Sequence, residues 1–92
     1  MIKSFSHKGL KRFFTLDDKS LLNAKDCPRI SRILDRLDGA VEAMDMNLPG
    51  YKLHKLVGNM KGFWSVTVSP NWRITFCFEN GDAHDVNLED YH

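Results

Sequence analysis

Cysteine is scarce in this chain. Its 92 residues include only Cys27 and Cys77, which fall in different expected elements. Neither belongs to a C-x-x-C pair or to a cysteine and histidine cluster with the spacing of metal ligands. We therefore expect two buried free thiols, no metal site and no other cofactor.

A long apolar run is also missing. No segment approaches the roughly 20 apolar residues that cross a bilayer, and residues 1–6 alternate apolar and polar side chains, unlike a signal peptide. With 42% hydrophobic and 27% charged residues, the chain is expected to fold as one soluble globular domain over residues 1–92. The expected compartment is the cytoplasm, without a membrane partner.

Acidic residues are absent from residues 46–78, and Lys and Arg are absent from residues 74–92. Residues 1–73 carry 13 basic and seven acidic side chains, a net charge of +6, whereas residues 74–92 carry −5. The acid-free stretch contains the cations Lys52, Lys55, Lys61 and Arg73. Such a basic tract suggests a polyanionic partner, nucleic acid first. The alternative is an ordinary solvated basic surface.

The first half of the chain has helical periodicity. After a short strand expected over Met1–Ser6, a helix is predicted from His7 to about Leu16, with an apolar stripe of Leu10, Phe13 and Phe14. A second helix is predicted over residues 26–44, capped by Asp26 and with Pro28 in its first turn. Its expected core face consists of Ile30, Ile33, Leu34, Leu37, Val41 and Met44.

Strands are predicted after the helix-breaking Asn-Leu-Pro-Gly at residues 47–50. Asn80-Gly81 is a strong hairpin signal. The expected strands are Tyr51–Leu56, Phe63–Val68, Trp72–Glu79 and about Ala83–Leu88. The predicted fold class is α+β, in which two helices pack on one face of a largely antiparallel sheet and the other face stays partly open.

Strand parity predicts what the open face carries. Trp72, Ile74 and Phe76 share one side of their strand, so Arg73 lies on the other. His54 is expected to emerge on that same side, together with Lys52. A guanidinium matches phosphate oxygens with a planar fork, so this face is a candidate phosphate site.

Each of these side chains also has a structural explanation. Arg73 could be an ion-pair partner of Glu79 or Asp85, and His54 an ordinary surface histidine. Trp64 and Trp72 are expected in the core, whereas Phe63 is a candidate for stacking on an unpaired base. No role is assigned to His7 or His84.

Six segments carry a resemblance to a known family. They are MIKSF (1–5), YKLHKL (51–56), GFWSVTV (62–68), NWRITFCF (71–78), NGDA (80–83) and EDYH (89–92). The specific combination is NWRITF before an Asn-Gly turn and a terminal DYH. The chain resembles the HigB toxins of the RelE superfamily, the toxins of type II toxin–antitoxin operons, also described as plasmid maintenance killer proteins.

The resemblance implies a ribosome-dependent endoribonuclease that needs no metal and cleaves mRNA in the ribosomal A site, which inhibits translation. It implies a compact fold with a curved sheet whose concave face holds the RNA. The implied partners are a HigA-like helix-turn-helix antitoxin, mRNA and the 70S ribosome with its rRNA. Operator DNA would be reached only through the antitoxin.

Five positions match the family's catalytic residues: His54, Arg73, Asp90, Tyr91 and His92. Lys52, Lys55 and Lys61 are expected to bind RNA phosphates together with Arg73. One departure concerns Val57, where relatives often carry lysine. Either one phosphate-binding cation is missing or Lys55 or Lys61 supplies it.

RNA carries its own nucleophile, the 2′-hydroxyl, so cleavage needs a base, an acid and cations, and leaves a 2′,3′-cyclic phosphate. We assign His54 or Asp90 as base, His92 as acid and Tyr91 as an orienting group, while Asp90 could instead fix a histidine tautomer. A straight last strand would point Asp90 and His92 into the core. The chain is therefore expected to leave strand geometry after about Leu88.

Two other functions remain open on the sequence. One is a module that binds RNA or the ribosome without cleaving RNA. The other is a protein-interaction domain that has kept the fold and lost the activity, for which Val57 is the hint.

Overall fold

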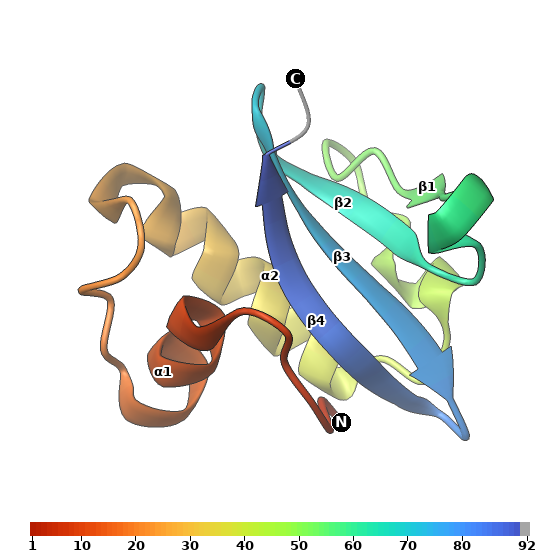
Figure 1. The fold of residues 1–92 in the computed structure, drawn as a ribbon, viewed down its shortest axis with the longest axis horizontal. Helices are drawn as coiled ribbons and strands as arrows, with labels where there is room; N and C mark the ends of the chain where they lie inside the picture. Colours follow the sequence, from red (N-terminus) through yellow and green to blue (C-terminus); the bar gives the residue numbers. More distant parts are fainter. Residues whose placement is uncertain (91–92) are drawn as a thin grey trace.

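The computed structural model describes residues 1–90. Two helices, α1 (Lys8–Leu16) and α2 (Cys27–Gly39), lie on one side of a four-stranded sheet (Figure 1). The strands are β1 (His54–Lys55), β2 (Trp64–Ser69), β3 (Trp72–Glu79) and β4 (Asp82–Asp90). They follow one another in the order β1-β2-β3-β4, and every neighbouring pair is antiparallel. The expected α+β architecture is confirmed.

The core lies between the helices and one face of the sheet. Leu10 of α1 is fully buried, and α2 contributes Ile30, Ile33, Leu34 and Leu37. The sheet meets these side chains with Val66, Val68, Ile74, Phe76, Ala83 and Val86. Alternation along β3 therefore places its apolar side chains as predicted, and Trp64 and Trp72 pack against the same core.

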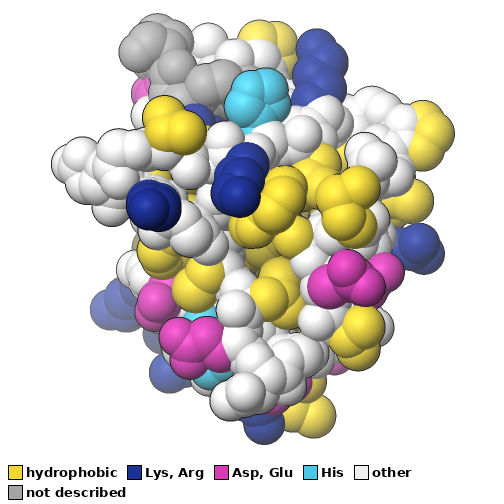
Figure 2. All heavy atoms as spheres, turned by 90° about the vertical axis from the view of Figure 1, so that its right-hand side faces the viewer, with side chains coloured by type: hydrophobic (Ala, Val, Ile, Leu, Met, Phe, Trp, Pro, Cys, Tyr) yellow, Lys and Arg dark blue, Asp and Glu magenta, His cyan; other side chains and the backbone are white. Residues whose placement is uncertain are grey.

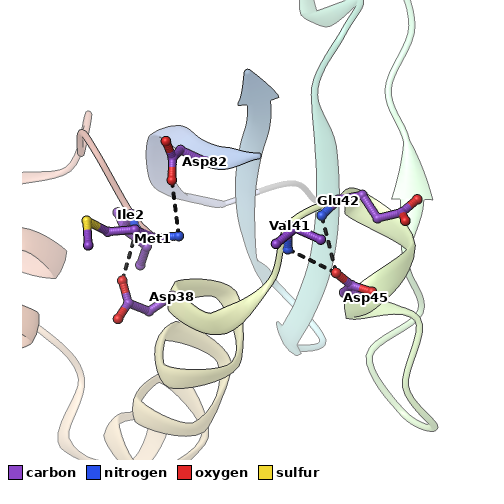
Figure 3. A network of polar contacts seen from close by, with 7 residues as sticks. All are labelled: Met1, Ile2, Asp38, Val41, Glu42, Asp45 and Asp82. Carbon is purple, nitrogen blue, oxygen red and sulfur yellow. Dashed lines mark hydrogen bonds and ion pairs between the residues drawn. The ribbon is translucent and has the colours of Figure 1, made fainter. Parts of the chain in front are cut away.

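The second helix is shorter than the sequence predicted. It ends at Gly39, because glycine is a poor helix former and Ala40 is extended, with ψ 151°. A new helical turn, η2 (Ala43–Met46), then begins, with the Asp45 carboxylate accepting hydrogen bonds from the N–H groups of Val41 and Glu42 (Figure 3). Asp26 stands at the N-cap position, but its side chain makes no capping hydrogen bond.

This break corrects two of the expected core residues. Val41 and Met44 are 62% and 55% exposed. The side chains buried in their place are Ala40, Ala43 and Met46. Continuing the periodicity of the helix through Gly39 was the source of the error, since the chain changes direction there.

Two short helical turns, η1 (Ala24–Asp26) and η3 (Gly58–Met60), complete the connections. The N-terminal residues do not form a full strand; they run parallel to β4 through two isolated bridges, Ile2 to Ala83 and Phe5 to Val86. Asp38 accepts a hydrogen bond from the Ile2 N–H, and the terminal amine lies 3.4 Å from Asp82 (Figure 3). The N-terminal segment thus covers the outer edge of β4.

The first strand of the sheet is also shorter than predicted. Of Tyr51–Leu56, only His54 and Lys55 pair with β2 as strand. Lys52 has a positive φ of 52°, which interrupts the extended backbone. The Tyr51 carbonyl nevertheless accepts a hydrogen bond of 2.8 Å from the Thr67 N–H, so this segment stays alongside β2.

The last strand is longer than predicted. It continues to Asp90, so the expectation that the chain leaves strand geometry after about Leu88 is wrong for Glu89 and Asp90. Glu89 pairs with Arg73, and Asp90 with Trp72. A bulge near the middle of β4 changes the register between Thr75 and Cys77, and Asp85 has a positive φ of 54° there. The Asn80-Gly81 turn is confirmed, since both residues have positive φ, 53° and 81°.

None of the helices within residues 1–90 combines the length and the hydropathy that a membrane crossing requires.

Candidate functional site

A hollow of about 220 Å³ lies on the sheet face that turns away from the helices. Its lining consists of Lys52, His54, Ser65, Thr67 and Arg73. Cross-strand pairing explains why these side chains meet. His54 stands opposite Ser65 and Thr67 stands opposite Arg73, and residues that pair directly across strands point to the same face.

The hollow brings together three of the residues that the sequence singled out. His54 and Lys52 come from the β1 side and are exposed, whereas Arg73 comes from the central strand and is half-buried. Parity placed His54 and Arg73 on one face, and the structure confirms this. The cationic and imidazole groups of these residues therefore surround a space large enough for a small anionic group.

Arg73 is bound by a carboxylate of the neighbouring strand. The Glu89 Oε1 atom accepts from the Arg73 Nε at 3.2 Å and from Nη2 at 3.0 Å. Their side chains are 24% and 26% exposed. The sequence offered Glu79 or Asp85 as an ion-pair partner of Arg73, and the structure shows an ion pair with Glu89.

The floor of this face is polar, and two of its side chains, Ser65 and Thr75, are buried. Ser65, Thr75 and Asn87 stand in one row across β2, β3 and β4, next to His54. Ser65 is 6% exposed, and the fully buried Thr75 hydroxyl has no hydrogen-bond partner among residues 1–90. This face of the sheet is therefore less accessible to solvent at its centre, at Ser65 and Thr75, than at its ends.

The remaining predicted cations lie outside the hollow. Lys55 occupies the opposite side of β1, where its Nζ lies 5.9 Å from the centre of the Trp64 ring. Lys61 lines a second hollow of about 370 Å³, together with Phe63, Cys77, Glu79 and Asp85. Val57 is 84% exposed at the start of η3. The structure therefore does not bring Lys55 or Lys61 next to Arg73 in the first hollow.

The second hollow also contains the Cys77 thiol. Burial raises its pKa, and the negative charges of Asp85 and Glu79 raise it further. Its sulfur lies 3.6 Å from the His84 carbonyl oxygen. Both cysteines are free, as expected, but only Cys27 is fully buried.

Asp90 lies on the opposite side of β4 from Glu89. It pairs with Trp72, whereas Glu89 pairs with Arg73 on the face that carries the hollow. Asp90 is not among the residues that line the hollow. The other two predicted catalytic residues, Tyr91 and His92, lie outside the described residues.

Sequence reasoning missed Glu89, Ser65 and Thr67. A plain two-residue hairpin at Asn80-Gly81 would place Leu88 opposite Arg73, and the bulge at Asp85 moves Glu89 into that position. One signal in the sequence could have revealed the bulge. Without a bulge, the core residue Ile74 would pair with the polar Asn87, although residues that pair directly point to the same face. No group of three or more potential metal ligands occurs within residues 1–90.

The side of the molecule drawn in Figure 2 carries Lys or Arg side chains in both its upper and its lower half. Most acidic side chains visible there lie in its lower half, whereas a histidine and several Lys or Arg side chains lie in its upper half (Figure 2). Hydrophobic side chains occupy the area between them.

Residues 3–92 match the family model described as "RelE-like toxin of type II toxin-antitoxin system HigB". The chain belongs to the HigB-like toxin family. It is 52% identical to the protein named Endoribonuclease HigB from Proteus vulgaris, over the full length of both chains. It is 30% identical to Toxin HigB-1 of Vibrio cholerae serotype O1 over 91 residues, which are 97% of this chain and 96% of that protein.

Solved structures share the fold of this HigB-like chain. The YoeB–YefM toxin–antitoxin complex from Staphylococcus aureus contains a chain that aligns with a TM-score of 0.63 and 16% identity, covering 100% of this chain and 98% of that one. YafQ from E. coli aligns with a TM-score of 0.54 and 15% identity, covering 98% of this chain and 93% of YafQ. The resemblance to the RelE-like toxins is therefore confirmed for both sequence and fold.

Proposed function

We propose that this endoribonuclease is the toxin of a type II toxin–antitoxin pair and cleaves mRNA in the ribosomal A site, without a metal ion or cofactor. Full-length identity of 52% to a protein named Endoribonuclease HigB supports the activity. The single structural observation that carries the proposal is the hollow shared by His54 and Arg73.

The chemistry of RNA cleavage fits this pair of groups. A general base must take the proton of the 2′-hydroxyl, and an imidazole is suited to that role because its ordinary pKa lies near neutral pH. Charge also develops on the phosphoryl oxygens, which Arg73 would stabilise with its guanidinium. Lys52 on the rim of the same hollow would bind a neighbouring phosphate.

The remaining roles rest on the family resemblance. Asp90, Tyr91 and His92 would complete the site, with His92 as the acid that protonates the leaving 5′-oxygen and Tyr91 orienting the substrate. Because Asp90 pairs with Trp72, away from the hollow face, we favour His54 over Asp90 as the base. Lys55 and Lys61 would contact RNA or rRNA outside the scissile phosphate.

An antitoxin is the natural protein partner. The family model names a type II toxin–antitoxin system, and related folds occur in the YoeB–YefM complex. We propose that this partner is a HigA-like helix-turn-helix protein, that operator DNA is reached only through it, and that the toxin acts in the cytoplasm on the 70S ribosome.

The test is cleavage of a defined mRNA in programmed ribosomes, with EDTA present and naked RNA alongside. Arg73→Ala and His54→Ala are expected to lower the cleavage rate by about 100-fold or more while the protein stays folded. His84→Ala is the control, because it removes a histidine near the start of β4, whereas Arg73 pairs with Glu89 near the end of that strand. Full activity of both site variants would refute the assignment. If the wild-type protein binds the ribosome but leaves the RNA intact, the result would support the alternative function, a module that binds without cleaving RNA.

A further inference from the structure

Arg29 connects helix α2 to the segment that precedes β1. Its Nη2 donates to the Gly50 carbonyl at 2.7 Å and to the Thr67 carbonyl at 2.9 Å, while Nε donates to the same Thr67 oxygen at 3.1 Å. The guanidinium also lies 5.3 Å from the centre of the Tyr51 ring. One side chain of α2 thus contacts both β2 and the chain before β1.

The two carbonyl groups lie where regular pairing fails. The register of β2 and β3 shifts between Thr67 and Ser69, and Gly50 has a positive φ of 85° in the turn before Tyr51. A carbonyl outside a regular ladder needs another donor. Arg29 supplies that donor, and a guanidinium is suited to the task because its N–H groups form a rigid planar fork.

The segment that Arg29 contacts makes little regular strand pairing. Only His54 and Lys55 pair with β2 as strand. Lys52, which precedes this pair, has an unfavourable backbone φ of 52°. A non-glycine residue in this conformation persists only when its surroundings fix it. The Tyr51 carbonyl, which accepts a hydrogen bond of 2.8 Å from the Thr67 N–H, is another link between this segment and β2, and Tyr51 and Leu53 also pack against the core.

Thr67 makes this contact relevant to the site. It lines the hollow and stands opposite Arg73, while Lys52 and His54 form the other wall. Arg29 itself is not part of the lining. A residue outside the lining of the hollow thus contacts Thr67 in one wall and the chain that leads to the other wall.

We infer that Arg29 is a positioning residue, which sets the Lys52 and His54 wall of the hollow against the Arg73 wall. This inference rests on the proposed function for its catalytic consequence. A displacement of about 1 Å can lower a rate roughly 100-fold, because proton transfer and phosphate binding both require a fixed geometry. Arg29→Ala is expected to lower kcat about 10- to 100-fold and to change KM by about threefold or less.

The experiment combines ribosome-dependent cleavage kinetics with amide hydrogen exchange. In Arg29→Ala, exchange at the Thr67 N–H is expected to accelerate about tenfold or more, whereas amides of the central strand β3, such as that of Ile74, keep wild-type rates. Arg29→Lys retains the charge but cannot reproduce the fork, so it is expected to fall between wild type and Arg29→Ala. Arg32→Ala is the matched control, since Arg32 is an exposed arginine on the same helix.

Two results would overturn the inference. One is wild-type kcat in Arg29→Ala despite faster exchange at Thr67. The other is accelerated exchange at both Thr67 and Ile74 in both Arg29 variants, since Arg29 would then support the whole fold. An inactive wild-type protein would instead refute the proposed function, and the exchange rates would still report whether Arg29 holds the segment.

Discussion

Glu89 binds Arg73 across two neighbouring strands, with a single carboxylate oxygen accepting from both Nε and Nη2 of the guanidinium. The pairing keeps the arginine head on the face of the hollow and compensates the charge of a half-buried cation. The arginine proposed to bind phosphate is thereby held in place before any RNA arrives.

A double-mutant cycle measures this pair. We expect Arg73→Ala and Glu89→Ala to show a coupling free energy of about 1 kcal/mol in urea unfolding, because both side chains are only partly exposed. Arg12 and Asp18 form the comparison pair at 2.7 Å, with side chains 44% and 27% exposed. Their coupling is expected to be smaller and to fall more steeply with salt. Additive single effects at Arg73 and Glu89 would contradict the prediction.

Thr75→Val is expected to raise the free energy of unfolding by about 1 kcal/mol. The buried hydroxyl has no hydrogen-bond partner in the part of the chain that the structure describes, so its desolvation is uncompensated there, and valine has nearly the same shape. Chemical denaturation measures the change. Thr67→Val, at a half-buried position of the same face, is the control and should change stability by less. A destabilised Thr75→Val protein would mean that the hydroxyl forms a hydrogen bond in solution.

Glycine to alanine changes at two positions should have opposite signs. Gly39 ends α2 with no atom within 4 Å of an added Cβ, so Gly39→Ala is expected to stabilise the protein by about 0.5 kcal/mol. Gly81 has φ 81° in the hairpin turn, so Gly81→Ala is expected to destabilise it by about 1 kcal/mol. Thermal and urea unfolding test both variants. Equal effects would contradict the backbone explanation.

The Cys77 thiol should react slowly with iodoacetamide. Its raised pKa reduces the thiolate fraction near pH 8, and the rate is expected to rise only above the ordinary thiol pKa of 9.0. A Cys27→Ala background isolates the reaction. Asp85→Asn removes one of the two negative charges and should shift the pH profile to lower pH, whereas Asp35→Asn, on α2, should leave it unchanged. A profile with an inflection below 9 would refute the prediction.

Much of the fold could be predicted because local patterns agree with it. The bounds of β3 match the predicted Trp72–Glu79, and Asn80-Gly81 forms the expected turn. The bounds of the second helix and of β1 were wrong because Gly39 and Lys52 change the backbone direction at single residues. Apolar periodicity does not register such local changes.

For the candidate site, alternation alone determined that His54 and Arg73 share the face opposite the helices, since a period of two fixes the side of every residue in a regular strand. Only the tertiary structure decided what stands beside them. The bulge at Asp85 shifts β4 by one residue and places Glu89 opposite Arg73. Arg29 reaches from α2 to carbonyl groups of Gly50 and Thr67 that are far from it in sequence. Such contacts depend on register and packing between distant segments, which no local pattern encodes.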